Sequence, residues 1–367
     1  MDERFQAVLA EMHRQVDAGL RPSIQVTVDW RGERVFEAAY GDGATPKSLY
    51  LMWSTTKPFV AIALLQLVEE GRVELKERVA HYLPEFGQRG KETATLAHVL
   101  SHRGGFPDNT PELRRNLFRV MRDWKTALEY IYEMEAAWEP GTDRGYHAIT
   151  GWFVLGELVQ RPDDRPLAES LRARVLDPLG IAPGAFSLGE PERLSTAPMR
   201  VHTSGTRGAP GEAEAAFWND PATHAAVIPG AGGISCSGEV VKLYRTLLDG
   251  GRGPNGQLLS AEMIRVATSP HVVGIRDRTF LRDIPWGLGF HLKHVISSLD
   301  DCGESATPGT FGHGGHFLVN TAWADPGKDL AVCILSNGLS EPRAGIRAVC
   351  ALSQSVHDVV DRSSRPA

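Results

Sequence analysis

Apolar and polar positions follow two different periods at the start of the chain. Residues 4–18 repeat apolar side chains every three or four positions, which predicts a helix that ends near Gly19. Residues 24–28 instead alternate apolar and polar side chains, the segment 31–33 is typical of a turn, and residues 35–40 return with a second run. These spacings predict a helix followed by a strand hairpin.

Residues 55–70 carry the strongest helical pattern in the chain. Their apolar side chains occupy most sides of a helix, and we therefore expect this helix to be buried. Pro58 is tolerated only in the first turn of a helix, so the helix is expected to begin close to Ser54. Gly71 is expected to end it.

The middle of the chain, residues 80–227, is helical and rich in loops, whereas strand patterns return after Gly230. Strands at both ends and helices between them predict a split α/β (α+β) domain, residues 1–79 and 228–367, with a helical domain inserted at 80–227. The expected later elements are a helix over 237–248 capped by Ser237, strands over 286–292, 318–324 and 329–335, and a helix over 343–360.

Composition and charge narrow the classes of partner. The 367 residues are 42% hydrophobic and 23% charged, which is ordinary for a globular protein. The net charge is −6 and the basic residues form no stripe, so we expect neither nucleic acid nor a membrane as a partner. No apolar run is long enough to span a bilayer and the first five residues do not resemble a secretory signal, so we expect a cytoplasmic protein.

The four cysteines all lie in the last third of the chain and share no spacing typical of a metal site. Because unpaired cysteines are among the most often buried residues, we expect buried, unreactive thiols at Cys236, Cys302, Cys333 and Cys350. The sequence gives no indication of a cofactor.

Ser54-Thr55-Thr56-Lys57 opens the buried helix and is the central chemical motif. Residues at positions i and i+3 share one face of a helix, so Lys57 is expected beside the Ser54 hydroxyl. A serine needs a neighbouring base to act as a nucleophile, and a buried lysine can serve because burial lowers its pKa. The structural alternative is a helix-capping serine followed by a surface lysine.

Tyr146, which follows Pro140-Gly141-Thr142, is a candidate second proton-transfer group. Next to Lys57 its phenolate would be favoured over the free phenol, whose ordinary pKa is about 10. The phenolate could then take the Ser54 proton and later return a proton to a leaving group. The alternative is an aromatic side chain packed under a loop.

His313-Gly314-Gly315-His316 stands directly before the strand expected near Leu318. Two glycines let the backbone approach a ligand closely, and a backbone N–H there can pair with that of Ser54 as an oxyanion hole. The two histidines of this motif, together with His291 and His294, offer an alternative metal site. No carboxylate has a matching spacing, which weighs against metal.

Together these motifs resemble the serine β-lactamase and penicillin-binding-protein superfamily, nearest the class C β-lactamases and the family VIII carboxylesterases. The resemblance covers nearly the whole chain and includes Leu100-Ser101-His102-Arg103-Gly104-Gly105-Phe106-Pro107 and Gly230-Ala231-Gly232-Gly233. It implies an antiparallel sheet flanked by helices with an inserted helical domain. It also implies a Ser54 nucleophile, Lys57 and Tyr146 as the proton-transfer pair, an oxyanion hole from the backbone of Ser54 and His316, and a covalent acyl-enzyme.

Two motifs depart from the lactamase pattern. Tyr-x-Asn is replaced by Tyr146-His147-Ala148, which lacks the amide that would hold a substrate's acylamide group. Lys-Thr-Gly is replaced by His313-Gly314-Gly315, whose histidine is mostly neutral at pH 7. Both changes remove lactam recognition and leave the acylation groups in place. We expect His147, His313, Gly314 and Gly315 to face the substrate.

The sequence thus predicts a serine hydrolase that acts on carboxylic esters, with a small-molecule ester or acyl donor as its partner. Three alternatives stay open: an acyltransferase that passes the acyl group to an alcohol or amine, a β-lactamase, and a non-catalytic binding protein on the same fold. The retention of Ser54, Lys57 and Tyr146 argues against the last. The acyl group, the acceptor and the oligomeric state do not follow from the sequence.

Overall fold

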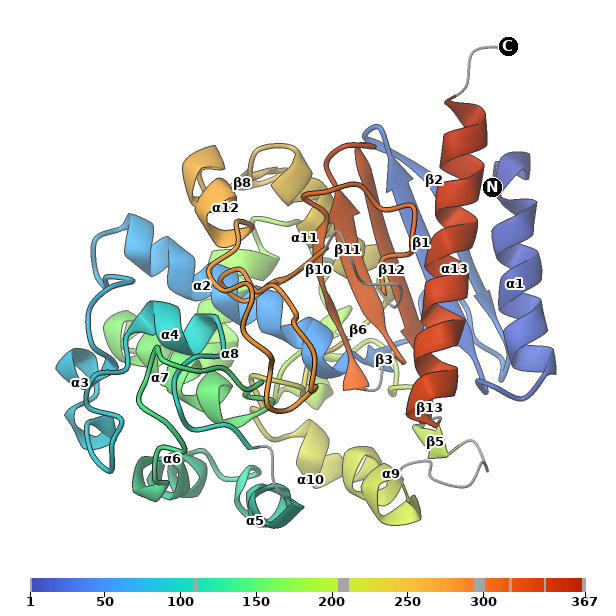
Figure 1. Cartoon of the computed structure of the whole chain (residues 1–367). Coiled ribbons are helices and arrows are strands. Elements are labelled where there is room, and N and C mark those ends of the chain that lie inside the picture. Colours follow the sequence, from blue (N-terminus) through green and yellow to red (C-terminus); the bar gives the residue numbers. More distant parts are fainter. Residues whose placement is uncertain are drawn as a thin grey trace.

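The structure is a computed structural model that describes residues 2–108, 111–203, 211–293, 301–316, 319–339 and 341–364, without the side chains of 111–114. A six-stranded sheet in the order β2-β1-β12-β11-β10-β9 forms one half of the molecule (Figure 1). Its neighbouring strands are all antiparallel, as expected. The strands are β1 (Ile24–Trp30), β2 (Glu33–Tyr40), β9 (His291–Leu292), β10 (Phe311–Gly314), β11 (Thr321–Asp325) and β12 (Leu330–Ser336).

The remaining strands are short and pair separately from this sheet. β3 (Tyr50–Leu51) and β4 (Phe186–Ser187) flank β6 (Ile234–Ser235), β5 (His202–Thr203) runs parallel to β13 (Gly338–Leu339), and β7 (Arg252–Gly253) pairs with β8 (Gly256–Gln257). The helices are α1 (Gln6–Asp17), α2 (Lys57–Glu69), α3 (Val79–Tyr82), α4 (Leu96–Leu100), α5 (Pro111–Val120), α6 (Trp124–Glu133), α7 (Thr150–Asp163), α8 (Leu167–Leu171), α9 (Glu212–Asn219), α10 (Pro221–His224), α11 (Ser237–Leu248), α12 (Ala261–Ala267) and α13 (Pro342–Ser363).

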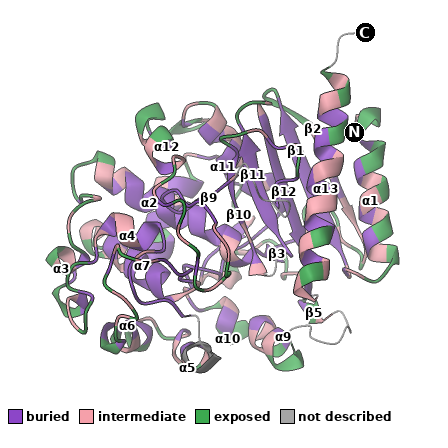
Figure 2. Cartoon of the chain, in the orientation of Figure 1, coloured by how far each residue is buried: buried purple, intermediate pink, exposed green. Residues whose placement is uncertain are grey.

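Strand β1 shows how the sheet is covered on both faces. All seven of its residues are buried, and β1, β11 and β12 are coloured as buried in Figure 2, whereas edge strand β2 has exposed residues. Val26 and Val28 pack in the core that the sheet forms with α1 and α13, which lie side by side in Figure 1. Gln25 and Thr27 lie on the α11 face: the Gln25 side chain accepts the Ser237 N–H at 2.7 Å, and the Thr27 and Ser237 hydroxyls are 2.7 Å apart. The polar residues of the alternating pattern are thus buried against a helix.

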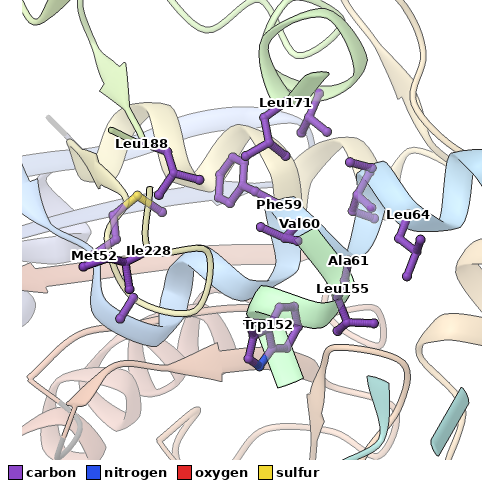
Figure 3. Packing of buried hydrophobic residues seen from close by; sticks show 14 of the residues in the cluster. Met52, Phe59, Val60, Ala61, Leu64, Trp152, Leu155, Leu171, Leu188 and Ile228 are labelled. Carbon is purple, nitrogen blue, oxygen red and sulfur yellow. The ribbon is translucent and has the colours of Figure 1, made fainter. Parts of the chain in front are cut away.

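Helix α2 runs through the largest hydrophobic core, as its sequence predicts. Every residue from Lys57 to Leu65 is buried. Figure 3 shows Phe59 and Ala61 of this helix packed among apolar side chains that include Trp152 from α7. Each fully buried large apolar side chain contributes about 1.5–3 kcal/mol. This packing fixes the position of the turn at the start of α2.

Several expected elements are confirmed: the first helix, the hairpin β1–β2, helix α2, and the terminal helix. The expected helix over 237–248 is also present, but its cap residue is Cys236 and not Ser237, which is the first helical residue. The regular elements described within residues 80–227 are helices joined by long loops, with β4 and β5 as two short strands. The proposed boundaries of the inserted domain stay an interpretation.

The strand expected over 286–292 is reduced to β9. A Cβ at Gly287 would lie 2.1 Å from the Ala267 oxygen, and one at Gly289 would lie 2.4 Å from the Ala61 Cβ. Gly289 also has φ +82°, which extended backbone does not allow. The strand expected from 318 begins at Thr321 as β11, and Leu318 lies outside the described residues. Among the described residues, no helix is long and apolar enough to cross a bilayer.

Candidate active site

Ser54 lies in a short 3-10 turn, Trp53–Thr56, that leads directly into α2. The turn is fixed from both sides of the serine. The Met52 N–H donates to the Gly233 carbonyl at 2.7 Å, and the Gly233 N–H donates to the Thr56 hydroxyl at 3.0 Å. Trp53 has φ +52°, an uncommon conformation for a bulky residue. Strain of this kind gathers at functional sites.

Lys57 lies beside Ser54, as the i, i+3 spacing predicts. Its Nζ atom is 2.9 Å from the Ser54 Oγ atom, 2.8 Å from the Ala148 carbonyl oxygen and 2.6 Å from the Gly230 carbonyl oxygen. The side chain is completely buried. A neutral amine in this position donates its two N–H groups to the two carbonyls and directs its lone pair at the serine hydroxyl.

Burial lowers the pKa of Lys57 well below its ordinary value, and the nearby Asp108 carboxylate opposes this shift. This shift favours the neutral amine, which is the form that can accept a proton from Ser54. The Gly230 carbonyl can come this close to Lys57 because residue 230 has no side chain. A Cβ there would lie 2.6 Å from the Ala148 carbonyl oxygen.

Tyr146 completes a three-residue group around the serine hydroxyl. Its phenol donates to the Ser54 Oγ atom at 2.9 Å, and its ring lies 5.2 Å from the Lys57 Nζ atom. The sequence predicted that the phenolate would be favoured here. The structure reverses this expectation: burial raises the pKa of Tyr146, so the side chain is a protonated donor at neutral pH.

Asp108 is a buried carboxylate that the sequence analysis did not single out. One of its oxygens accepts the Ala148 N–H at 2.7 Å and the other accepts the Ile149 N–H at 3.0 Å. It thereby holds the backbone whose next carbonyl binds Lys57, just before α7 begins. The only signal in the sequence is its place directly after the Leu100–Pro107 motif, about 40 residues from its partners.

The strand β10 brings the third motif against the turn that carries Ser54. His313 and Gly314 are the last residues of this strand, so the motif ends one strand and does not simply precede the next. A Cβ at Gly315 would lie 3.2 Å from the Trp53 Cβ and 3.3 Å from the Met52 carbonyl oxygen. Glycine permits this approach. The backbone N–H groups of Ser54 and His316 stay the predicted oxyanion hole.

His313 is a neutral, buried histidine. Its Nδ1 atom is 2.8 Å from the Gly314 carbonyl oxygen and therefore carries a proton, while Nε2 has no partner among the described residues. Burial and the nearby Lys57 lower the pKa of His313 to about 3. The ring lies 6.1 Å from that of Tyr146. The position that would carry a cation for a substrate carboxylate is thus uncharged at pH 7.

His147 is fully buried and helps to shape the loop before Asp108. Its ring Nε2 atom accepts the Phe106 backbone N–H at 3.3 Å. The backbone N–H of His147 donates to the His102 Nδ1 atom at 3.1 Å. The His102 ring lies 4.6 Å from that of Tyr146. The Leu100–Pro107 motif therefore supports the tyrosine, and the predicted contact of His147 with substrate stays a prediction.

The alternative metal site is not assembled by those of its histidines that the structure describes. Among the described residues, no group of three or more histidines, cysteines or carboxylates is placed to hold a metal ion. His291 pairs with Asp301 at 3.4 Å, and His294 lies outside the described residues.

Three cysteines are buried and the fourth is partly buried, and burial raises the pKa of the Cys236 and Cys333 thiols.

The comparisons with known proteins agree on one family and one fold. The family model described as Beta-lactamase matches residues 8–352. A protein of Escherichia coli (strain K12), named as a proposed D-alanyl-D-alanine carboxypeptidase, is 26% identical over 93% of this chain and 84% of its own length. A solved family VIII carboxylesterase superposes with a TM-score of 0.76 at 23% identity, covering 96% of this chain and 98% of its own. EstCE1, described as a hydrolase with promiscuous acyltransferase activity, gives 0.79 at 18% identity, covering 97% and 99%.

Proposed function

The chain belongs to the beta-lactamase family of serine hydrolases, and we propose that within it this enzyme cleaves carboxylic esters through an acyl-enzyme on Ser54. The observation that carries the proposal is the hydrogen-bonded group of Ser54, Lys57 and Tyr146, set beside an uncharged histidine at position 313. The three-residue group supplies the means to acylate the serine. The neutral histidine points to substrates without a carboxylate.

In the proposed acylation, neutral Lys57 takes the proton of the Ser54 hydroxyl as the oxygen attacks the ester carbonyl. The new Ser–O–acyl bond forms through a tetrahedral intermediate, whose oxyanion is held by the backbone N–H groups of Ser54 and His316. When this intermediate collapses, the bond to the alcohol breaks. Tyr146 protonates the departing alkoxide and takes a proton in turn from the Lys57 ammonium.

The division of roles between the two proton-transfer groups, Lys57 and Tyr146, follows from their opposite pKa shifts. The pKa of Lys57 is lowered, so it can begin the reaction as a base. The pKa of Tyr146 is raised, so it begins as a hydrogen-bond donor and can act as an acid. Groups whose environments push their pKa values apart are suited to complementary acid and base roles.

Two positions favour esters over β-lactams or D-alanyl-D-alanine peptides. Both of those substrates present a carboxylate, and His313 offers it no charge. Ala148 provides only backbone groups, whose N–H is held by Asp108 and whose carbonyl is held by Lys57, so no side-chain amide meets an acylamide. A simple ester needs neither contact.

The test compares kcat/KM for p-nitrophenyl butyrate, a cephalosporin and a D-alanyl-D-alanine peptide on the purified protein. We expect the ester to be turned over far faster than both other substrates, and the activity to disappear in Ser54→Ala. Ser355→Ala is the matched control, because its hydroxyl donates to the Leu352 carbonyl one turn earlier in α13, outside the site. Turnover of the cephalosporin or the peptide at the rate of the ester would refute the proposal.

A further inference from the structure

The loop between α12 and β9 exposes apolar side chains in an unusual concentration. Among the described residues, the large hydrophobic side chains classed as exposed are Val273, Phe280 and Leu281, at 55%, 43% and 62%. All three belong to the segment 272–286, which we call the 272–286 loop. Single exposed apolar residues need no explanation, but several in one short loop indicate a contact surface.

The 272–286 loop contacts Tyr146 through a hydrogen bond to the tyrosine backbone and through aromatic rings that pack on the tyrosine ring. The Asp277 carboxylate accepts the N–H groups of Tyr146, Thr279 and Phe280 at 3.4, 2.8 and 3.0 Å. The Phe280 ring lies 5.0 Å from the Tyr146 ring. Trp286, at the end of the loop, stacks on the same tyrosine at 5.5 Å and belongs with it to a small hydrophobic cluster.

The conformation of Leu281 is a second, independent observation. It has φ +57°, a left-handed conformation that is unfavourable for a leucine. The Leu281 N–H donates to the Asp277 carbonyl at 2.7 Å, and its carbonyl accepts from the Arg276 side chain at 2.8 Å. The turn thus holds a large apolar side chain in water, in a backbone conformation that asparagine or glycine would adopt more readily.

The proposed mechanism indicates which part of the substrate lies beside the 272–286 loop. Tyr146 protonates the leaving alcohol, so the alcohol oxygen must come within hydrogen-bonding distance of the phenol. The group attached to that oxygen then extends past Tyr146, where Phe280 packs on the ring. Because deacylation by an alcohol retraces this step, an acceptor alcohol would enter by the same route.

We propose that Phe280 and Leu281 form a subsite for the apolar alcohol portion of the ester and, in transfer reactions, for an apolar acceptor alcohol. The inference rests on the proposed ester function and adds the class of alcohol. Esters of hexanol or benzyl alcohol are preferred over esters of ethanol with the same acyl group.

The experiment measures kcat/KM for ethyl, hexyl and benzyl acetate by titration of the acid released, with Leu281→Asn and Phe280→Ala. Asparagine tolerates the left-handed conformation, so Leu281→Asn is expected to fold with an unchanged or higher melting temperature. Each variant should lower the hexyl-to-ethyl ratio of kcat/KM by about tenfold. Val273→Asn is the matched control, because Val273 is an exposed apolar residue at the start of the same loop, and this variant should retain the preference.

A second series, ethyl acetate, butyrate and hexanoate, varies only the acyl group and should respond little to either variant. The idea is wrong if both variants retain the alcohol preference, if Val273→Asn loses it equally, or if the acyl series changes instead. Saturation-transfer NMR of 1-hexanol on Ser54→Ala gives a readout that needs no turnover. Binding of 1-hexanol to Ser54→Ala that disappears in Ser54→Ala/Leu281→Asn supports the subsite, and absence of binding to Ser54→Ala overturns it. Failure of the proposed ester function would be seen separately, as the absence of turnover that depends on Ser54.

Discussion

Replacing Asp108 by asparagine removes one charge and one acceptor from beneath the active site. The carboxylate accepts the N–H groups of Ala148 and Ile149 at 2.7 and 3.0 Å and is 2% exposed. An asparagine amide can accept only one of these bonds, and its NH2 group faces the other donor. A hydrogen bond to a buried charge contributes about 1.5–3 kcal/mol, and an unsatisfied buried donor costs about 1–3 kcal/mol. We expect the free energy of unfolding to fall by about 2.5–6 kcal/mol, the sum of these two contributions.

The same substitution also changes the charge near Lys57. The Asp108 carboxylate raises the pKa of Lys57 against the larger effect of burial, so its loss lowers that pKa further. The base is active when unprotonated, and the acid limb of kcat/KM against pH should therefore move to lower pH. The maximum rate should fall, because the Ala148 carbonyl that binds Lys57 is less well held.

The assay is the pH profile of kcat/KM for a neutral ester, combined with denaturant unfolding at fixed pH. Asp123→Asn is the control, since its carboxylate caps α6 by accepting the Thr126 N–H at 2.8 Å and is not among the groups that shift Lys57. The control should lose some stability without moving the acid limb. If Asp108→Asn loses stability but keeps the acid limb, or moves it to higher pH, then Asp108 does not act through the charge of Lys57.

Three further predictions test other parts of the site. Lys57→Ala and Tyr146→Phe should each lower kcat/KM for an ester by roughly 10²–10⁴-fold. Their double variant should be little worse than the worse single one, because residues acting as a unit are non-additive; multiplicative losses would indicate separate proton paths. Gly315→Ala places a Cβ 3.0 Å from Asn320 and 3.2 Å from Trp53, and should reduce turnover with little loss of melting temperature; wild-type turnover would show that this contact yields freely. Rising concentrations of a small alcohol should divert the acyl group from acid to new ester, measured by chromatography, whereas acid alone at every concentration would indicate that only water reaches the acyl-enzyme.

The sequence predicted helices and strands best where the pattern of apolar positions was regular and local. Helix α2 has apolar residues on most sides, and the hairpin β1–β2 alternates regularly around a turn with Arg31 and Gly32 at positive φ. Residues 286–292 also alternate, yet only His291 and Leu292 form a strand. Their glycines serve close packing against Ala267 and Ala61, which no local pattern reveals.

Within the site, the i, i+3 spacing placed Lys57 beside Ser54 because both groups belong to one turn of backbone. Asp108 could not be found in this way, because its role depends on two backbone N–H groups that only the fold brings near. The ionisation of Tyr146 was predicted in the wrong direction for a related reason. Its proximity to Lys57 was anticipated, but its complete burial, which raises its pKa, is a property of the assembled structure.

The central claim is that the reaction passes through an ester of Ser54. The most direct measurement is intact-mass spectrometry of the protein quenched during turnover of p-nitrophenyl butyrate, followed by peptide mapping. The account predicts one added butyryl group on the peptide that contains Ser54, and none in Ser54→Ala under the same conditions. A butyryl group on another residue, or equal acylation of Ser54→Ala, would contradict it.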